Sequence, residues 1–288
     1  MKMSYNTRSG RTPNGKLDDP RQLPNSASEF YPIHRRSLNI QYENVYKIED
    51  ILNIPSVQYD NSLLIKNLTR DELIIIGHRY DILNTLNDDE KTLALYLHKV
   101  LQNDPYTTGV RENLTDSFVN YLLGEIRFNK YPFLLNLQSD YSFYICSTKV
   151  TAKIDFSVEK DNNILCFDED KHLHGVSLAT EYGESQISAE MLACAYTNHD
   201  KADSSTREQD QMIFAMRVIG SRFTLYKSFI NKDYIQSLVE GFPQEDMNII
   251  RFPPNTGNTR HGYDFADEQQ RPLVLDLLVR LREYMRNM

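Results

Sequence analysis

The chain has 288 residues, of which 40% are hydrophobic and 11% are aromatic, as is ordinary for a globular protein. Its net charge of −8 and pI near 5.4 argue against broad attraction to polyanions, although a local basic groove or bound metal ions can offset an acidic average. No apolar run approaches the ~20 residues of a membrane span, and the polar N-terminus lacks a signal-peptide core. We therefore expect an intracellular protein, cytoplasmic or nuclear, without membrane contact.

Three regions of the chain differ in composition. Residues 1–29 are rich in Asn, Ser, Arg, Pro and Gly and are expected to form a disordered tail. Residues 30–105 have mostly helical periodicity and are expected to form a helical N-terminal subdomain. Residues 106–288 mix helical and strand patterns, which predicts an α/β domain. The cysteines lie in apolar segments and are expected to be reduced.

Capping residues mark two helices in the N-terminal subdomain. Asn67 or Thr69 can cap a helix over residues 71–86, and Asn87 precedes a helix over residues 88–103.

Beyond residue 106 the pattern predicts a sheet flanked by helices. The last helix has an apolar seam that is expected to pack internally, with a homodimer contact as the alternative. The expected elements are a helix over 110–126, a strand over 141–148, a hairpin over 153–171, a helix over 185–196, strands over 212–219 and 222–229, a short helix over 234–240 and a last helix over 272–286.

The hairpin carries the candidate chemistry. Its sequence, KIDFSVEKDNNILCFDEDK, predicts two strands joined by a polar turn over residues 159–163. A hairpin centred near residue 162 places Asp155 directly across from Glu169, with Cβ atoms ~5 Å apart. Alternation predicts that Ile154, Phe156 and Val158 share the opposite face from Asp155.

Two carboxylates at that separation can hold one hard cation, with Lys171 just beyond it, which indicates a site for metal-assisted hydrolysis. The competing interpretation is a solvated group of charges at a strand end, because such patterns are frequent. A zinc site from Cys166, His172 and His174 lacks the spacings typical of zinc ligands.

The order of these elements resembles the PD-(D/E)XK, or restriction-endonuclease-like, nuclease superfamily, including the nuclease domains of Crinkler-type proteins. The resemblance covers roughly residues 107–230, and it departs from the motif in having Ile154 where the family often has Pro. The matching residues are Glu112 in RENLTDSFVNYLL, Asp155 in AKIDFSV, Glu169 and Lys171 in CFDEDKHL, and Gln186 in GESQISAEML.

The resemblance implies a restriction-endonuclease-like core, a mixed central sheet flanked by helices. It further implies that Asp155, Glu169 and Glu112 bind Mg²⁺ or Mn²⁺, that Lys171 positions or activates the attacking water, and that Gln186 helps to hold the substrate or water. The expected activity is metal-dependent hydrolysis of nucleic-acid phosphodiester bonds, in DNA rather than RNA. The alternative is a catalytically inactive relative that binds nucleic acid or protein.

Overall fold

A computed structural model of the chain describes residues 15–65, 68–103, 112–161, 163–169, 182–202, 209–255 and 262–288. Within these ranges, no helix is both long and apolar enough to cross a membrane.

The strands form one mixed sheet in the order β1-β7-β6-β5-β4-β3-β2, with β8 beside β6. The β1–β7 and β4–β5 pairs are parallel and the other pairs are antiparallel. The strands are β1 (Ile40–Asn44), β2 (Leu134–Ile145), β3 (Thr148–Lys160), β4 (Asn163–Glu169), β5 (Gln211–Ile219), β6 (Arg222–Ile230), β7 (Met247–Phe252) and β8 (Tyr263–Asp264).

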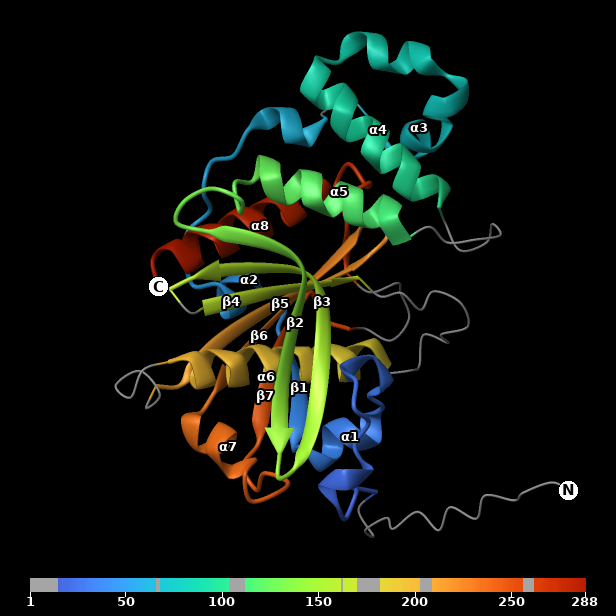
Figure 1. The fold of residues 1–288 in the computed structure, drawn as a ribbon. Helices are drawn as coiled ribbons and strands as arrows, with labels where there is room; N and C mark the ends of the chain where they lie inside the picture. The colour runs from blue at the N-terminus through green and yellow to red at the C-terminus, as the bar shows by residue number, and fades with distance from the viewer. Residues whose placement is uncertain are drawn as a thin grey trace, which may run out of the picture.

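Helices cover both faces of this sheet. The α-helices of the described residues are α1 (Pro32–Ser37), α2 (Ile48–Ile51), α3 (Arg70–Ile75), α4 (Asp88–Gln102), α5 (Glu112–Glu125), α6 (Tyr182–Lys201), α7 (Lys232–Ser237) and α8 (Arg271–Arg286). Figure 1 shows α4, α5 and α8 on one side of the sheet and α1, α6 and α7 on the other. The protein is therefore an α/β structure with a mixed sheet between helical layers.

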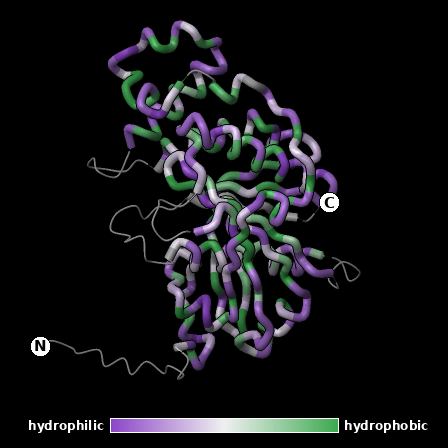
Figure 2. Tube along the Cα trace, turned by 180° about the vertical axis from the view of Figure 1, so that it is seen from behind, coloured by the Kyte–Doolittle hydropathy of each residue, from purple (hydrophilic) through white to green (hydrophobic). Residues whose placement is uncertain are grey.

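Two buried cores follow from this layering. Figure 2 shows hydrophobic and hydrophilic residues interspersed along the helices, as is typical of amphipathic helices that bury one face. The α8-side core includes Leu97, Phe118, Phe156, Met216 and Leu278, and the α6-side core includes Tyr141, Ile154, Ile187, Leu192 and Ile213. The apolar seam of α8 is buried within the chain, as expected, and a homodimer contact stays a prediction.

The N-terminal part is more integrated than its composition predicts. Residues 15–29 were expected to lie in a disordered tail, yet Leu23 and Ala27 are buried in the α6-side core. The predicted helical subdomain also contains β1, which extends the sheet beside β7. Its sequence, IQYEN, has too few apolar residues to be recognised as a strand. Its strand conformation comes from pairing with β7 and not from local propensity.

The caps of the N-terminal helices were predicted more successfully than the helix lengths. Thr69 and Asn87 both accept hydrogen bonds in capping boxes, at the starts of α3 and α4. The helix predicted over 71–86 instead ends at Ile75 and continues as two short 3-10 turns, Ile76–His78 and Tyr80–Thr85.

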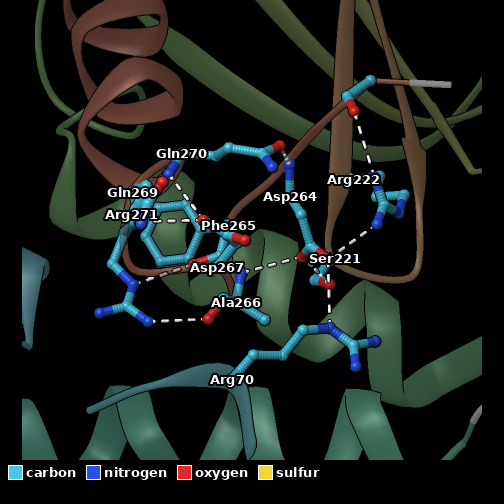
Figure 3. A network of polar contacts seen from close by, with 11 residues as sticks. Arg70, Ser221, Arg222, Asp264, Phe265, Ala266, Asp267, Gln269, Gln270 and Arg271 are labelled. Atoms are coloured by element: carbon cyan, nitrogen blue, oxygen red, sulfur yellow. Dashed lines mark hydrogen bonds and ion pairs between the residues drawn. The ribbon is translucent and has the colours of Figure 1, made fainter. Parts of the chain in front are cut away.

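A polar network fastens the N-terminal helical part to the C-terminal helix (Figure 3). The buried Arg271 guanidinium donates to the backbone carbonyls of Leu64 at 2.6 Å, Phe265 at 2.9 Å and Ala266 at 2.9 Å. Burial lowers the pKa of Arg271 to about 10, which leaves it charged at neutral pH.

Asp264 completes this network from β8. Its carboxylate accepts a hydrogen bond from Ser221 Oγ at 2.6 Å and forms ion pairs with Arg222 at 3.1 Å and Arg70 at 3.3 Å (Figure 3). Because its carboxylate oxygens are occupied by protein donors, we assign this cluster a structural role.

Candidate functional site

The β3–β4 hairpin has a tighter turn than predicted. Lys160 pairs with Asn163, and Asp161 between them has a φ of 47°, as the primed turns of two-residue hairpins require. The centre therefore lies between residues 161 and 162, and Phe156 pairs with Phe167. The predicted turn over residues 159–163 is too long, because Glu159 and Lys160 still pair with β4. The β3–β4 pairing ends before Asp155, so the direct opposition of Asp155 and Glu169 stays a prediction.

β3 also changes face at Asp155. Ile154 packs in the α6-side core whereas Phe156 packs in the α8-side core, so the predicted common face of these residues is wrong. The ladder with β2 pairs Ser139 with Ile154 and skips Gln138, whose φ of 51° interrupts the extended backbone. Asp155, at the break, is 7% exposed.

The structure places the strands of Asp155 and Glu169 side by side in the sheet, as β3 and β4, without describing every predicted side chain. Glu169 ends β4 beside Val218 of β5, and Glu112 begins α5 on the opposite face of the sheet from α6. The side chains of Glu112 and Glu169, and all of Lys171, lie outside what the structure describes. Among the described side chains, no group of three or more His, Cys, Asp or Glu could hold a metal ion.

The structure describes no side chain of the three residues considered as alternative zinc ligands. His172 and His174 lie outside the described residues, and Cys166 is placed only by its backbone, opposite Ser157.

Gln186 lies in the second turn of α6 because this helix begins at Tyr182, three residues earlier than predicted. Its side-chain amide donates a hydrogen bond to Glu190 Oε1 at 2.8 Å. Glu190 is 1% exposed and was not identified from the sequence. The signal was present in the four-residue spacing of Gln186 and Glu190, which places both side chains on one face of a helix.

Arg217 is a second buried residue that the sequence analysis missed. It lies on β5, where its Cα pairs with that of Asp168 on β4. Its guanidinium packs against the first turn of α6, because a Cβ on Gly183 would lie only 2.7 Å from Arg217 Cζ. The absence of a side chain at Gly183 thus allows a buried cation to approach the helix next to the end of β4.

The next residue of α6, Glu184, joins the helix to the far half of the sheet. Its carboxylate forms a buried ion pair with Arg251 of β7. Arg251 also donates to Asn44 Oδ1 from Nε at 3.0 Å and from Nη2 at 2.8 Å. The Tyr42 hydroxyl donates to the backbone carbonyl of Glu184 at 2.5 Å. Three elements, α6, β7 and β1, therefore meet at this helix end.

The register of the sheet explains this convergence. Asn44 pairs with Arg251, and Arg251 pairs with Tyr226, so their Cα atoms lie side by side across β1, β7 and β6. Burial raises the pKa of both Tyr42 and Tyr226, and the nearby Glu184 carboxylate raises both further. Both hydroxyls remain protonated donors at neutral pH.

A basic pocket opens beside this network, with a volume of about 490 Å³. Its walls carry four cationic side chains and one carboxylate, that of Glu184. Two of the cations face the same aromatic ring, with Arg35 Cζ 5.1 Å and Arg251 Cζ 5.6 Å from the centroid of Tyr42. The lining residues are Lys16, Arg35, Arg36, Asn39, Ile40, Gln41, Tyr42, Glu184, Arg251 and Asn255.

Comparisons with known proteins add little to this geometry. No family model and no curated protein matches the chain. A solved structure described as "Crystal structure of SSO0001" matches 67% of this chain and 79% of its own, with 12% sequence identity and a TM-score of 0.26. A likeness at that TM-score carries no argument about fold or function.

Proposed function

We propose that this protein is a metal-dependent nuclease that hydrolyses phosphodiester bonds of nucleic acid, DNA in preference to RNA. The observation that carries the proposal is the buried carboxylate of Asp155, at the break in β3. Asp155 lies in the strand that pairs with β4, and β4 ends at Glu169, the first residue of the ExK sequence, so this carboxylate is suited to bind a cation.

The order of elements supports a restriction-endonuclease-like core. Helix α5, strand β2, the β3–β4 hairpin, helix α6 and the β5–β6 pair follow one another as in the order on which the resemblance rests. Because β5 runs parallel to β4, the carboxyl ends of both strands lie at the same edge of the sheet. Arg217 of β5 adds a buried cation near the end of β4.

The predicted ligand set fits a hard divalent cation in chemical type. Asp155, Glu169 and Glu112 all offer carboxylate oxygens, which Mg²⁺ prefers, and Asp155 is the ligand whose side chain the structure describes. When bound, Mg²⁺ supplies polarisation of the phosphoryl oxygen and a water of lowered pKa. Lys171 is proposed to add positive charge where the pentavalent transition state becomes more negative. Gln186, held by Glu190, is proposed to orient the substrate or the water.

A cleavage assay tests the proposal. Purified wild-type protein and the Asp155→Asn variant are incubated with end-labelled single- and double-stranded DNA and RNA, in Mg²⁺, in Mn²⁺ and in EDTA. Wild type should cut DNA in either metal and not in EDTA, and Asp155→Asn should not cut. Asp161→Asn is the matched control, because Asp161 lies in the same hairpin with a side chain that is 81% exposed. If folded wild-type protein leaves all four substrates intact, the protein is not a nuclease and the binding-module alternative takes its place.

A further inference from the structure

We propose that the basic pocket beside α6 binds a phosphate monoester, carried by a nucleoside monophosphate or by the end of a nucleic-acid strand. This inference rests on the proposed function for the choice of nucleic acid as the carrier. The pocket itself is defined by described residues that lie mostly outside the segment resembling the nuclease superfamily.

The charge of the pocket selects the class of ligand. Lys16, Arg35, Arg36 and Arg251 carry four positive charges and Glu184 carries one negative charge, which leaves a net of three positive charges. This local excess opposes the net charge of −8 of the whole chain. A phosphate monoester carries about −1.5 to −2 charges at neutral pH. It therefore matches the pocket better than a bridging diester, with its single charge.

The cations are held in place before any ligand arrives. Arg251 is fixed by Glu184 and Asn44, and Arg35 is buried with its guanidinium over the Tyr42 ring. Guanidinium groups held in this way keep their positive charge at a fixed position beside the pocket, where it can attract a phosphate group. Pre-organisation lowers the entropy cost of binding, so the pocket suits a small, highly charged group.

Arg36 is the cation most available to a ligand. It lines the pocket and is exposed, and in the described part of the chain its guanidinium makes no hydrogen bond or ion pair. The volume of about 490 Å³ falls within the ~300–1,000 Å³ typical of small-molecule sites, so a nucleoside can enter with its phosphate. The side chain of Gln41, which lines the pocket, offers a polar contact to that nucleoside.

Helix α6 connects this pocket to the candidate catalytic hairpin. Glu184 lines the pocket, and the preceding Gly183 contacts Arg217, whose Cα pairs with Asp168 of β4. A strand end held in the pocket would therefore lie beside the helix turn that borders the hairpin. For a nuclease, this arrangement favours substrates with a phosphorylated end.

Binding in EDTA tests the pocket separately from cleavage. The probes are inorganic phosphate, adenosine 5′-monophosphate, and one oligodeoxynucleotide with a 5′-phosphate, a 3′-phosphate or only hydroxyl ends. Wild type should bind at least one phosphomonoester about tenfold more tightly than the matching nucleoside or hydroxyl-ended strand, a difference of about 1.4 kcal/mol. Tight binding of the mononucleotide alone identifies a free nucleotide as the ligand, and tight binding of a phosphorylated oligonucleotide identifies the strand end.

Variants of Arg36 make the test specific, because an exposed side chain can be changed without unfolding the protein. Arg36→Ala should remove the preference for the phosphomonoester, and Arg36→Glu should weaken binding further. Arg79→Ala is the matched control, because Arg79 is an exposed arginine, paired with Asp81, outside the pocket. Equal affinity for phosphorylated and hydroxyl ends, or an unchanged preference in Arg36→Glu, overturns the proposal. Binding without cleavage in Mg²⁺ refutes the nuclease and leaves the pocket standing.

Discussion

Arg251 of β7 and Glu184 of α6 form an ion pair in which the side chains are only 9% and 7% exposed. The pair ties the helix that follows the candidate catalytic hairpin to the opposite half of the sheet. The adjacent Gly183 leaves room for Arg217 of β5. One turn of α6 therefore touches both the edge of the basic pocket and the strand next to β4.

Breaking this ion pair should destabilise the protein strongly. Arg251→Met leaves the Glu184 carboxylate buried without its cation, which should lower the free energy of unfolding by about 3–5 kcal/mol. The double variant Glu184→Gln/Arg251→Met removes both charges and should recover part of that loss. Urea denaturation of the two single variants and the double variant measures the coupling. Strictly additive losses would show that the pair contributes no interaction energy.

The metal site can be tested without a substrate. In the apo protein Asp155 adds negative charge close to the acids at the end of β4, so Asp155→Asn should melt at or above the wild-type temperature. A ligand that binds only the folded state stabilises it by ~2.7 kcal/mol at a hundredfold excess over Kd. Mn²⁺ should therefore raise the melting temperature of wild type and of Asp161→Asn, and raise that of Asp155→Asn much less. Equal metal-induced shifts in all three proteins would exclude Asp155 as a ligand.

Lys171 should be required for cleavage and not for metal binding. Its ammonium group provides no ligand to a cation, and its proposed role is to stabilise negative charge in the transition state. Lys171→Ala should abolish cleavage and keep the wild-type affinity for Mn²⁺ in calorimetry. Lys153→Ala, at an exposed position on β3, is the control and should cleave normally. A loss of Mn²⁺ affinity in Lys171→Ala would show that the assigned role is wrong.

Gly183 should be sensitive to a single added methyl group. A Cβ there overlaps the Arg217 guanidinium and displaces it, so Gly183→Ala should reduce cleavage while circular dichroism shows an unchanged helix content. Gly124→Ala in α5 is the control, because its Cβ would lie 3.4 Å from the nearest atom, Asn129 Nδ2. That control should keep its activity and can gain up to ~1 kcal/mol from helix propensity. Equal activity in the two variants would show that the Arg217 contact with α6 is dispensable.

Alkaline pH should weaken the fold through buried tyrosines. Burial raises the pKa of Tyr141 to about 12, and its hydroxyl donates to Ser157 Oγ at 2.9 Å. In the unfolded chain a tyrosine loses its proton near pH ~10, whereas folded Tyr141 keeps its proton up to about 12. The stabilising contribution is thus complete below pH ~10 and falls as the pH rises toward 12. Denaturation across this range should show a steeper loss for wild type than for Tyr141→Phe, and identical slopes would contradict the assignment.

Local signals in the sequence were sufficient for the helix starts and for the simplest hairpin. The capping boxes of Thr69 with Glu72 and of Asn87 with Glu90 lie within one helical turn, so the side chains that make them are adjacent in sequence. The turn between β5 and β6 falls at Gly220, whose φ of 62° suits glycine. Both features depend on residues a few positions apart.

The geometry of the candidate site depended on tertiary structure. Period-two alternation places Ile154 and Phe156 on one face only if the strand is unbroken, and the positive φ of Gln138 on the neighbouring strand is not visible in the pattern around Asp155. The hairpin turn is shorter than predicted because it closes on Asp161, which tolerates a positive φ.

The basic pocket also could not be predicted from the sequence, because its residues come from segments that are far apart along the chain. Arg36 comes from a segment expected to be helical, Lys16 from a segment expected to be a disordered tail, and Arg251 from a strand that was not predicted. The sequence by itself determined that these residues are cationic and that the chain contains enough amphipathic helices and strands for a layered α/β fold. Only the parallel pairing of β1 with β7 and the packing of α6 across the sheet brought their charges together, because those contacts join residues that are 67 to 207 positions apart in the sequence.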